Sequence, residues 1–266
     1  MIKSLSDTVT LNNSVSMPGF GLGVWQIRDG KEVIDSVQYA LQAGYRMIDT
    51  AAVYRNEGGV GEAIRRSGLL RKSLFVTTKV VDQGYDATLR AFEDSTAKLG
   101  IDTIDLYLIH WPIGDHYLET WKAMERLYRD GRVRAIGVSN FGQHHLETLL
   151  QEAAVVPAVN QIEVHPLQTQ IGLRNYCYAK GIRVESYSPL GSGALLDHPV
   201  LNRIAEEYHK SVAQVLLRWN IQNEMIAIPR STKEEHIVAN ADIFDFELSF
   251  ETMDQMDALN VDKSVS

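Results

Sequence analysis

The chain has 266 residues, of which 45% are hydrophobic and 23% are charged, and its formal net charge is -8. This apolar content is enough for a sizeable core, and we expect one domain over residues 1–266. The excess of acidic side chains argues against nucleic acid or an anionic membrane as a general partner. The single cysteine, Cys177, excludes an internal disulfide and a cysteine metal cluster.

The N-terminal stretch lacks the continuous apolar character of a signal peptide. No run elsewhere in the chain approaches the roughly 18 apolar residues that a membrane span requires. We therefore expect a cytoplasmic protein without a membrane partner.

The first predicted element is a small hairpin over residues 9–17, in which two short strands flank an Asn-Asn-Ser turn. After a predicted strand near residues 21–25, the chain repeats one rhythm: an amphipathic segment ends at a glycine and a short apolar run begins. Gly44, Gly100, Gly131 and Gly181 occupy this place. Glycine is typical of the left-handed residue just past a helix, because it has no Cβ to clash.

The apolar runs after these glycines predict strands, and further strands are predicted at residues 74–80, 158–164 and 225–230. The runs lack strict alternation, which is typical of parallel strands covered on both faces. Eight strand–helix units of this length favour an α/β fold of the TIM-barrel type, a closed (β/α)8 barrel, over an open doubly wound sheet. We expect the hairpin to plug the barrel floor and residues 249–260 to form a final helix.

In such a barrel the chemistry lies at the C-terminal ends of the strands. The predicted strands end, in chain order, at Val24 and Trp25, Asp49 with Tyr54 in its loop, Lys79, His110 and Trp111, Ser139 and Asn140, Gln161, Tyr187 to Pro189, and Arg230 to Thr232. An acid, a phenol, an amine and an imidazole therefore share one rim.

These four groups are the parts of an acid catalyst. Free tyrosine has a pKa of about 10, and a nearby ammonium lowers it. We expect Asp49 to hold Lys79 charged, Lys79 to lower the pKa of Tyr54, and His110 to hydrogen-bond beside the phenol. Tyr54 would then protonate an oxygen as negative charge develops on it. Taken singly, Lys79 has a structural alternative as a salt-bridge partner of Asp49, and His110 as a hydrogen-bonded core histidine.

Several common motifs are missing from the sequence. No His-x-His or Cys-x-x-Cys spacing indicates a metal site. The stretch "GFGLG" at residues 19–23 lacks the third glycine of a dinucleotide-binding motif, and there is no P-loop and no G-x-S-x-G elbow.

The chain resembles the aldo-keto reductases, and among them the bacterial and protozoan branch that includes glyoxal reductases and 2,5-diketo-gluconate reductases. The resemblance covers almost the whole chain. It is carried, in the family's order, by "GYRMIDTAAVYRNEGGVG", "LFVTTKV", "DLYLIHWP", "VRAIGVSNF", "VNQIEVHP", "ESYSPLG" and "IPRSTKEEHIVANADIFDFEL".

The resemblance implies hydride transfer from NADPH to an aldehyde or ketone, such as methylglyoxal or a diketo sugar. It implies that Tyr54 is the acid, that Lys79 and Asp49 tune it, and that His110 orients the carbonyl. The positions that match the family's cofactor contacts are Ser139, Asn140 and Gln161 at the nicotinamide amide, Tyr187 stacked on its ring, Ser188, Leu190, Gly191 and Ser192 at the pyrophosphate loop, and Arg230, Ser231, Thr232, His236 and Asn240 at the adenosine 2′-phosphate end. The family's usual state is a monomer, which we also expect here.

The predicted phosphate clamp departs from the family pattern. Arg230 stands where the family has a lysine, which keeps the charge and adds a bidentate fork. His236 stands at the family's arginine position, and Ala239 at its glutamate position. Loss of one charged hydrogen bond, worth roughly 1.5–3 kcal/mol, reduces the preference for NADPH over NADH about ten- to a hundredfold. We expect NADPH use with appreciable NADH use.

The substrate side also departs from the family. Val81 stands where the family has a tryptophan, the following loop is about two residues shorter by family comparison, and the sequence ends at Ser266 where the family continues into a tail. Because all three changes remove bulk, we expect a wider and less selective pocket, lined in part by Trp25, Tyr54, His110 and Trp111.

Two other functions stay open at this point. A class I aldolase would use Lys79 as a Schiff-base nucleophile, although pairing with Asp49 would keep that lysine charged. A regulatory barrel would bind NADP without turnover, although a pure binder need not keep Tyr54 and Lys79 together.

Overall fold

The computed structural model describes residues 2–265 and contains two sheets. The first is an antiparallel hairpin of β1 (Thr8–Thr10) and β2 (Ser16–Pro18). The second has eight parallel strands, each paired with the next along the chain: β3 (Leu22–Gly23), β4 (Met47–Asp49), β5 (Phe75–Val80), β6 (Ile104–Ile109), β7 (Val133–Ser139), β8 (Val159–Glu163), β9 (Arg183–Tyr187) and β10 (Ile226–Ala227). All eight strands predicted from the sequence are therefore present.

Backbone hydrogen bonds between the first and last strands close the sheet. Gly21 N donates to Ala227 O at 3.0 Å, and Gly23 N donates to Pro229 O at 3.1 Å. A bridge between Phe20 and Ala227 lies beside them. The predicted (β/α)8 barrel is confirmed.

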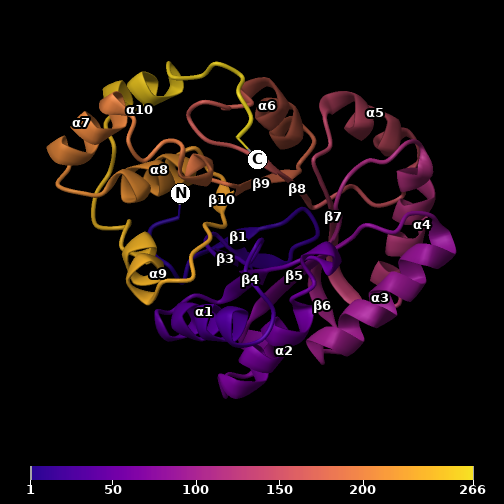
Figure 1. Cartoon of the computed structure of the whole chain (residues 1–266). Helices are drawn as coiled ribbons and strands as arrows, with labels where there is room; N and C mark the ends of the chain where they lie inside the picture. The colour runs from indigo at the N-terminus through magenta and orange to yellow at the C-terminus, as the bar shows by residue number, and fades with distance from the viewer. Residues whose placement is uncertain (1, 266) are drawn as a thin grey trace.

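Helices surround the strands in Figure 1. They are α1 (Lys31–Gln42), α2 (Glu57–Arg66), α3 (Tyr85–Leu99), α4 (His116–Arg129), α5 (Gln143–Glu152), α6 (Ile171–Ala179), α7 (Pro199–Glu207), α8 (Val212–Gln222), α9 (Glu234–Ala241) and α10 (Phe250–Asp257). Gly100 ends α3 in the left-handed conformation with φ of 65°, as predicted. The final helix, α10, is present but shorter than the predicted range.

The hairpin closes one end of the barrel, as predicted. Leu11 and Met17 are buried in one cluster with interior strand residues such as Leu106. At the hairpin turn, Asn12 Nδ2 donates to Pro157 O and Asn13 Nδ2 donates to Arg134 O, both at 2.9 Å. These carbonyls lie near the starts of β7 and β8, so the opposite end is left for a site.

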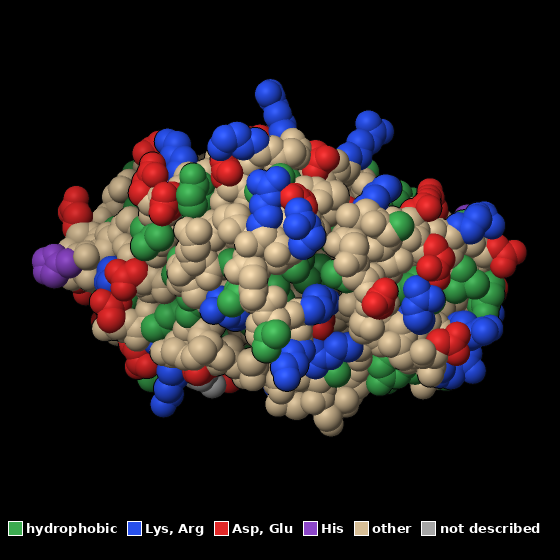
Figure 2. All heavy atoms as spheres, turned by 90° about the horizontal axis from the view of Figure 1, so that it is seen from below, with side chains coloured by type: hydrophobic (Ala, Val, Ile, Leu, Met, Phe, Trp, Pro, Cys, Tyr) green, Lys and Arg blue, Asp and Glu red, His purple; other side chains and the backbone are tan. Residues whose placement is uncertain are grey.

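Charged side chains of both signs are interspersed over the face drawn in Figure 2, without a continuous basic patch on that face. No helix within residues 2–265 combines the length and the apolar character needed to span a membrane.

We predict that Gly61→Ala destabilises the protein by about 1–3 kcal/mol, because overpacking a tight interface strains the backbone. A Cβ on Gly61 in α2 would lie 2.2 Å from Leu99 O at the end of α3. The matched control is Gly172→Ala in α6, where a Cβ would meet no atom within 4 Å. We expect the control to be neutral, or up to about 1 kcal/mol more stable. Urea unfolding midpoints measure both, and equal stabilities for the two variants would contradict the packing argument.

Candidate active site

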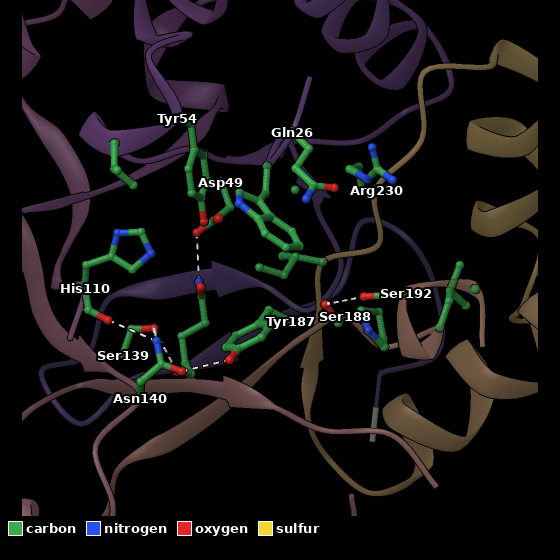
Figure 3. Close-up of a pocket in the computed structure, with 18 of the residues that line it drawn as sticks. Gln26, Asp49, Tyr54, His110, Ser139, Asn140, Tyr187, Ser188, Ser192 and Arg230 are labelled. Carbon is green, nitrogen blue, oxygen red and sulfur yellow. Dashed lines mark hydrogen bonds between the residues drawn. The ribbon is translucent and has the colours of Figure 1, made fainter. Parts of the chain in front are cut away.

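A cavity of about 510 Å³ lies where the barrel strands end. It is lined by many residues that the sequence predicted: Trp25, Asp49, Tyr54, His110, Trp111, Ser139, Asn140, Gln161, Tyr187, Ser188, Leu190, Ser192, Arg230 and His236. Figure 3 shows the labelled side chains converging on this space from several strands and loops. Strand ends far apart in the sequence therefore contribute to one site.

Some predicted residues lie outside the lining of the cavity. Lys79 is fully buried below the cavity and contacts Tyr54, which lines the cavity. Gly191 belongs to the short turn Gly191–Gly193, between two residues that do line it. Ser231 and Thr232 follow Arg230 in the loop before α9, and Asn240 is buried on α9 with 6% of its surface exposed. These last three side chains are not brought to the cavity wall.

Lys79 meets three acceptors inside the barrel. Its Nζ donates to Asp49 Oδ1 at 2.5 Å, to Thr50 O at 3.1 Å and to Tyr54 Oη at 3.3 Å. Neighbouring strands create this arrangement, because β4 pairs with β5 so that Asp49 lies opposite Thr77, two residues before Lys79. An ammonium has three N–H donors, and these contacts use all of them.

The pKa of Tyr54 differs from the prediction. Burial raises the pKa of its phenol, and the positive charge of Lys79 offsets only part of that rise. The predicted net lowering is therefore wrong in direction, since the sequence does not reveal how deeply the phenol is buried. The phenol stays protonated at neutral pH and is able to donate.

Burial disfavours the charged form of Lys79, but the interaction with Asp49 has a larger effect in the opposite direction. Desolvation alone would lower the pKa of Lys79, whereas the negative charge of Asp49 and the hydrogen bond that Lys79 donates to it raise that pKa above its ordinary value. Burial also raises the pKa of Asp49, and the Lys79 ammonium counteracts that rise. Lys79 is a charged ammonium, as the sequence predicted.

His110 is a neutral imidazole next to the phenol. Burial, and then the positive charge of Lys79, lower the pKa of His110 to about 3. Its ring meets the Tyr54 ring edge-on, with centroids 5.6 Å apart. Within residues 2–265 its Nδ1 has no hydrogen-bond partner. Because the neutral ring also lines the cavity, it is able to hydrogen-bond with a ligand there without changing its charge.

A chain of hydrogen bonds fixes the opposite wall. Tyr187 Oη donates to Asn140 Oδ1 at 2.8 Å, and Asn140 Nδ2 donates to His110 O at 3.0 Å. Ser139 Oγ donates to Gln161 O at 3.0 Å. Asn140 has a left-handed backbone, with φ of 63°. The dashed lines between Tyr187, Asn140 and His110 in Figure 3 follow this chain.

Two buried polar residues beside the site were missed by the sequence analysis. Asn56 accepts from Thr50 Oγ1 at 2.8 Å and donates to Val24 O and Ile27 O, both at 2.9 Å, which ties the loop of Tyr54 to the loop of Trp25. Glu185 on β9 accepts from Gln161 at 2.8 Å inside the barrel. The only signal for Glu185 was a lone acid within an apolar run.

The lining of the cavity includes exposed apolar and exposed polar side chains. Trp25, Val53 and Trp111 are the exposed large apolar residues. Arg230 and His236 are also exposed. The segment before the C-terminus is fixed elsewhere, because Ser264 Oγ and Val265 N both donate to the Glu163 carboxylate, at 2.6 and 2.7 Å.

A profile of the aldo/keto reductase family matches residues 20–261. The chain belongs to the aldo/keto reductase family. It is 57% identical to a glyoxal reductase of Bacillus subtilis (strain 168), over 100% of this chain and 97% of that protein. Among solved structures, an aldo/keto reductase from Brucella melitensis superposes with a TM-score of 0.92 at 49% identity, covering 95% of this chain and 98% of that one.

A Bombyx mori aldo-keto reductase in complex with NADP superposes with a TM-score of 0.93 at 37% identity, covering 100% of this chain and 96% of that one. This reductase is an NAD(P)H-dependent oxidoreductase.

We predict that His110 of this reductase does not titrate between pH 5 and pH 8, because its pKa of about 3 keeps the ring neutral over that window. Histidine-labelled NMR would follow its ring shifts. In Lys79→Met, one of the two causes of the lowering is removed, so the midpoint should rise while burial keeps it below that of free histidine. A wild-type midpoint near the ordinary value of 6.5 would show that the ring is solvated and would contradict the prediction.

Proposed function

We propose that this reductase transfers hydride from NADPH to aldehydes and ketones, with Tyr54 as the general acid. The observation that carries the proposal is the placement of the Tyr54 hydroxyl at the cavity, 3.3 Å from the buried ammonium of Lys79. The similarity to a glyoxal reductase supports 2-oxoaldehydes such as methylglyoxal as substrates. Diketo sugars are a second candidate class.

The cofactor, when bound, supplies the hydride to the carbonyl carbon. Negative charge then develops on the carbonyl oxygen, and Tyr54 donates its proton to that oxygen to complete the alcohol. Lys79 stabilises the phenolate that Tyr54 becomes, because its ammonium already contacts the phenol oxygen. Asp49 keeps Lys79 charged throughout. His110 hydrogen-bonds the carbonyl oxygen as a neutral ring and thereby orients the substrate.

The residues around the cavity fit a nicotinamide dinucleotide. Ser139, Asn140 and Gln161 would hold the carboxamide, and Tyr187, held by its bond to Asn140, would stack on the ring. Gly191 and Ser192 have left-handed backbones, with φ of 60° and 51°, in the turn that would cover the pyrophosphate. Arg230 and His236, which are exposed and line the cavity, would bind the 2′-phosphate end, with Ser231 and Thr232 beside Arg230 in the chain.

A broad set of substrates is consistent with the shape of the mouth. The lining includes the exposed apolar residues Trp25, Val53 and Trp111, together with Tyr54 and His110. The segment 260–265 is fixed beside β8 and contributes nothing to the lining. Selection would therefore rest on carbonyl geometry and apolar contact more than on ion pairing with the substrate.

The two other functions are less well supported. A Schiff-base aldolase needs a neutral amine, whereas Asp49 raises the pKa of Lys79 and keeps it charged. Failure of borohydride to trap substrate on Lys79 would exclude the aldolase. A protein that binds NADP without turnover would not require a protonated phenol next to a buried ammonium. Carbonyl-dependent NADPH oxidation distinguishes such a protein from a reductase.

We predict that Tyr54→Phe lowers kcat for methylglyoxal reduction by about 10²–10⁴-fold, the range for loss of a general acid. NADPH binding should change little, because the hydroxyl serves the carbonyl rather than the cofactor. Tyr107→Phe is the matched control, since Tyr107 is fully buried and its hydroxyl has no partner within residues 2–265. Steady-state NADPH oxidation measures both variants. Retention of wild-type kcat in Tyr54→Phe would refute the assignment.

For the cofactor, we predict a preference for NADPH over NADH, measured as a ratio of kcat/KM values, of no more than about a hundredfold. Arg230→Gln should lower kcat/KM for NADPH about ten- to a hundredfold and leave NADH nearly unchanged, because a charged hydrogen bond is worth roughly 1.5–3 kcal/mol. His236→Arg should raise the preference. A wild-type preference of several hundredfold, or equal losses with both cofactors in Arg230→Gln, would contradict this view of the clamp.

A further inference from the structure

Glu185 is a buried acid that the proposed chemistry does not use. It lies on β9 opposite Gln161 of β8 and Ile226 of β10, and its side chain is fully buried. Its Oε2 accepts from Gln161 Nε2 at 2.8 Å. Its Oε1 is buried and has no hydrogen-bond partner within residues 2–265. A buried carboxyl group with one unpartnered oxygen is costly, which makes its presence beside the site informative.

The amide of Gln161 is held between two acids. Its Nε2 donates to Asp49 Oδ2 and to Glu185 Oε2, both at 2.8 Å. An amide nitrogen has two hydrogens, so both are used. Rotation of the amide by 180° would instead place its oxygen against the carboxylate of Asp49, which can only accept hydrogen bonds. Together the acids therefore determine which way the amide of Gln161, a residue that lines the cavity, is turned.

Glu185 also interacts electrostatically with Tyr54, the proposed general acid, and with Lys79 beside it. Burial, and then the negative charge of Asp49, raise the pKa of Glu185 to about 8. Glu185 therefore holds its proton at neutral pH and loses it as the pH rises through about 8. Once ionised, its charge raises the pKa of both Lys79 and Tyr54. The titratable groups around it are Asp49 from β4, Lys79 from β5 and Tyr54 from the turn after β4.

We propose that Glu185 is a positioning residue of the reductase, which orients the Gln161 amide toward the cofactor and, when ionised, places a second negative charge behind the Asp49–Lys79 pair. The proposal rests on the proposed function, since it assigns Gln161 to the nicotinamide carboxamide. With Glu185 on one side and Asp49 on the other, the Gln161 oxygen is turned away from both acids and is free to accept from that carboxamide.

The charge role is tested with Glu185→Gln, which keeps the volume and a neutral acceptor for Gln161 but cannot ionise. In the wild type the folded-state pKa of about 8 exceeds the ordinary value of 4.5, so stability is lost as the pH rises from 4.5 through 8. The variant lacks this loss. We expect the Tm of the variant minus that of the wild type to increase by about 3–6 °C between pH 6 and pH 9.

The same substitution should shift the pH dependence of the reaction. Without the Glu185 charge, the pKa of Tyr54 falls, so the alkaline limb of kcat/KM for methylglyoxal reduction should shift to lower pH in Glu185→Gln. A purely structural role for Glu185 would lower activity equally at all pH values and would not move this limb.

The amide role is tested with Glu185→Ala, which removes one of the two acceptors that hold Gln161. We expect NADPH affinity, measured by fluorescence titration, to fall about fivefold, while Glu185→Gln stays within about twofold of the wild type. Thr77→Val is the matched control, because Thr77 is fully buried on β5 and its hydroxyl has no partner within residues 2–265. It should change neither the pH dependence of Tm nor NADPH affinity.

A Glu185→Gln variant with the wild-type pH dependence of Tm, or a Glu185→Ala variant with wild-type NADPH affinity, would overturn the proposal. Neither measurement requires turnover. A protein that passed both tests yet reduced no carbonyl would therefore refute the proposed function and leave the role of Glu185 intact.

Discussion

The site depends on the burial of one ammonium group in the interior of the barrel. An unpaired charge there would cost far more than the net stability of a protein, so Lys79 requires acceptors for all of its donors. Asp49, the carbonyl of Thr50 and the hydroxyl of Tyr54 are those acceptors. The phenol that faces the cavity is thus also part of the solvation shell of the lysine. The three contacts that stabilise the buried ammonium are therefore the same contacts that the proposed acid catalysis uses.

The same constraint organises the neighbouring loops. Tyr54 lies in a 3-10 turn, Ala52–Tyr54, and Asn56 holds that turn by bonds to Thr50 and to the loop after β3. On the other side, the second carboxylate oxygen of Asp49 accepts a hydrogen bond from the amide of Gln161, which also donates to Glu185. A polar network therefore crosses the barrel from β5 to β9. The shared hydrogen bonds of such a buried network limit how far any one of its members can move.

Much of the fold and the core of the site could be predicted from the sequence. The alternation of amphipathic segments, glycines and apolar runs predicted eight parallel strands, since each signal is local. Parallel strands share one C-terminal edge, so Asp49, Tyr54, Lys79 and His110 could be expected together before any contact was known. The hairpin was predicted from its turn residues, and in the structure its Leu11 and Met17 are buried against interior strand residues.

What could not be predicted depends on register and burial. In the sequence Glu185 is a single acid within an apolar strand. Only the strand register, which places it opposite Gln161, shows that it contacts a residue of the site. The direction of the pKa shift of Tyr54 depends on how far desolvation exceeds the effect of Lys79, and neither quantity is encoded by residue spacing. Ser231, Thr232 and Asn240 were expected at the cofactor by position, but loop and helix geometry leaves them outside the cavity lining.

The central claim is that this cavity transfers hydride to a carbonyl carbon while the protein supplies a proton to the oxygen. The most direct test uses NADPH in which both hydrogens of the reactive ring carbon are replaced by deuterium, together with methylglyoxal and the wild-type protein, followed by mass spectrometry and NMR of the product. The account predicts one deuterium on the new carbinol carbon, in a stoichiometry of one product per NADPH oxidised. Tight NADPH binding without labelled alcohol would contradict it and would identify the barrel as a binder rather than a reductase.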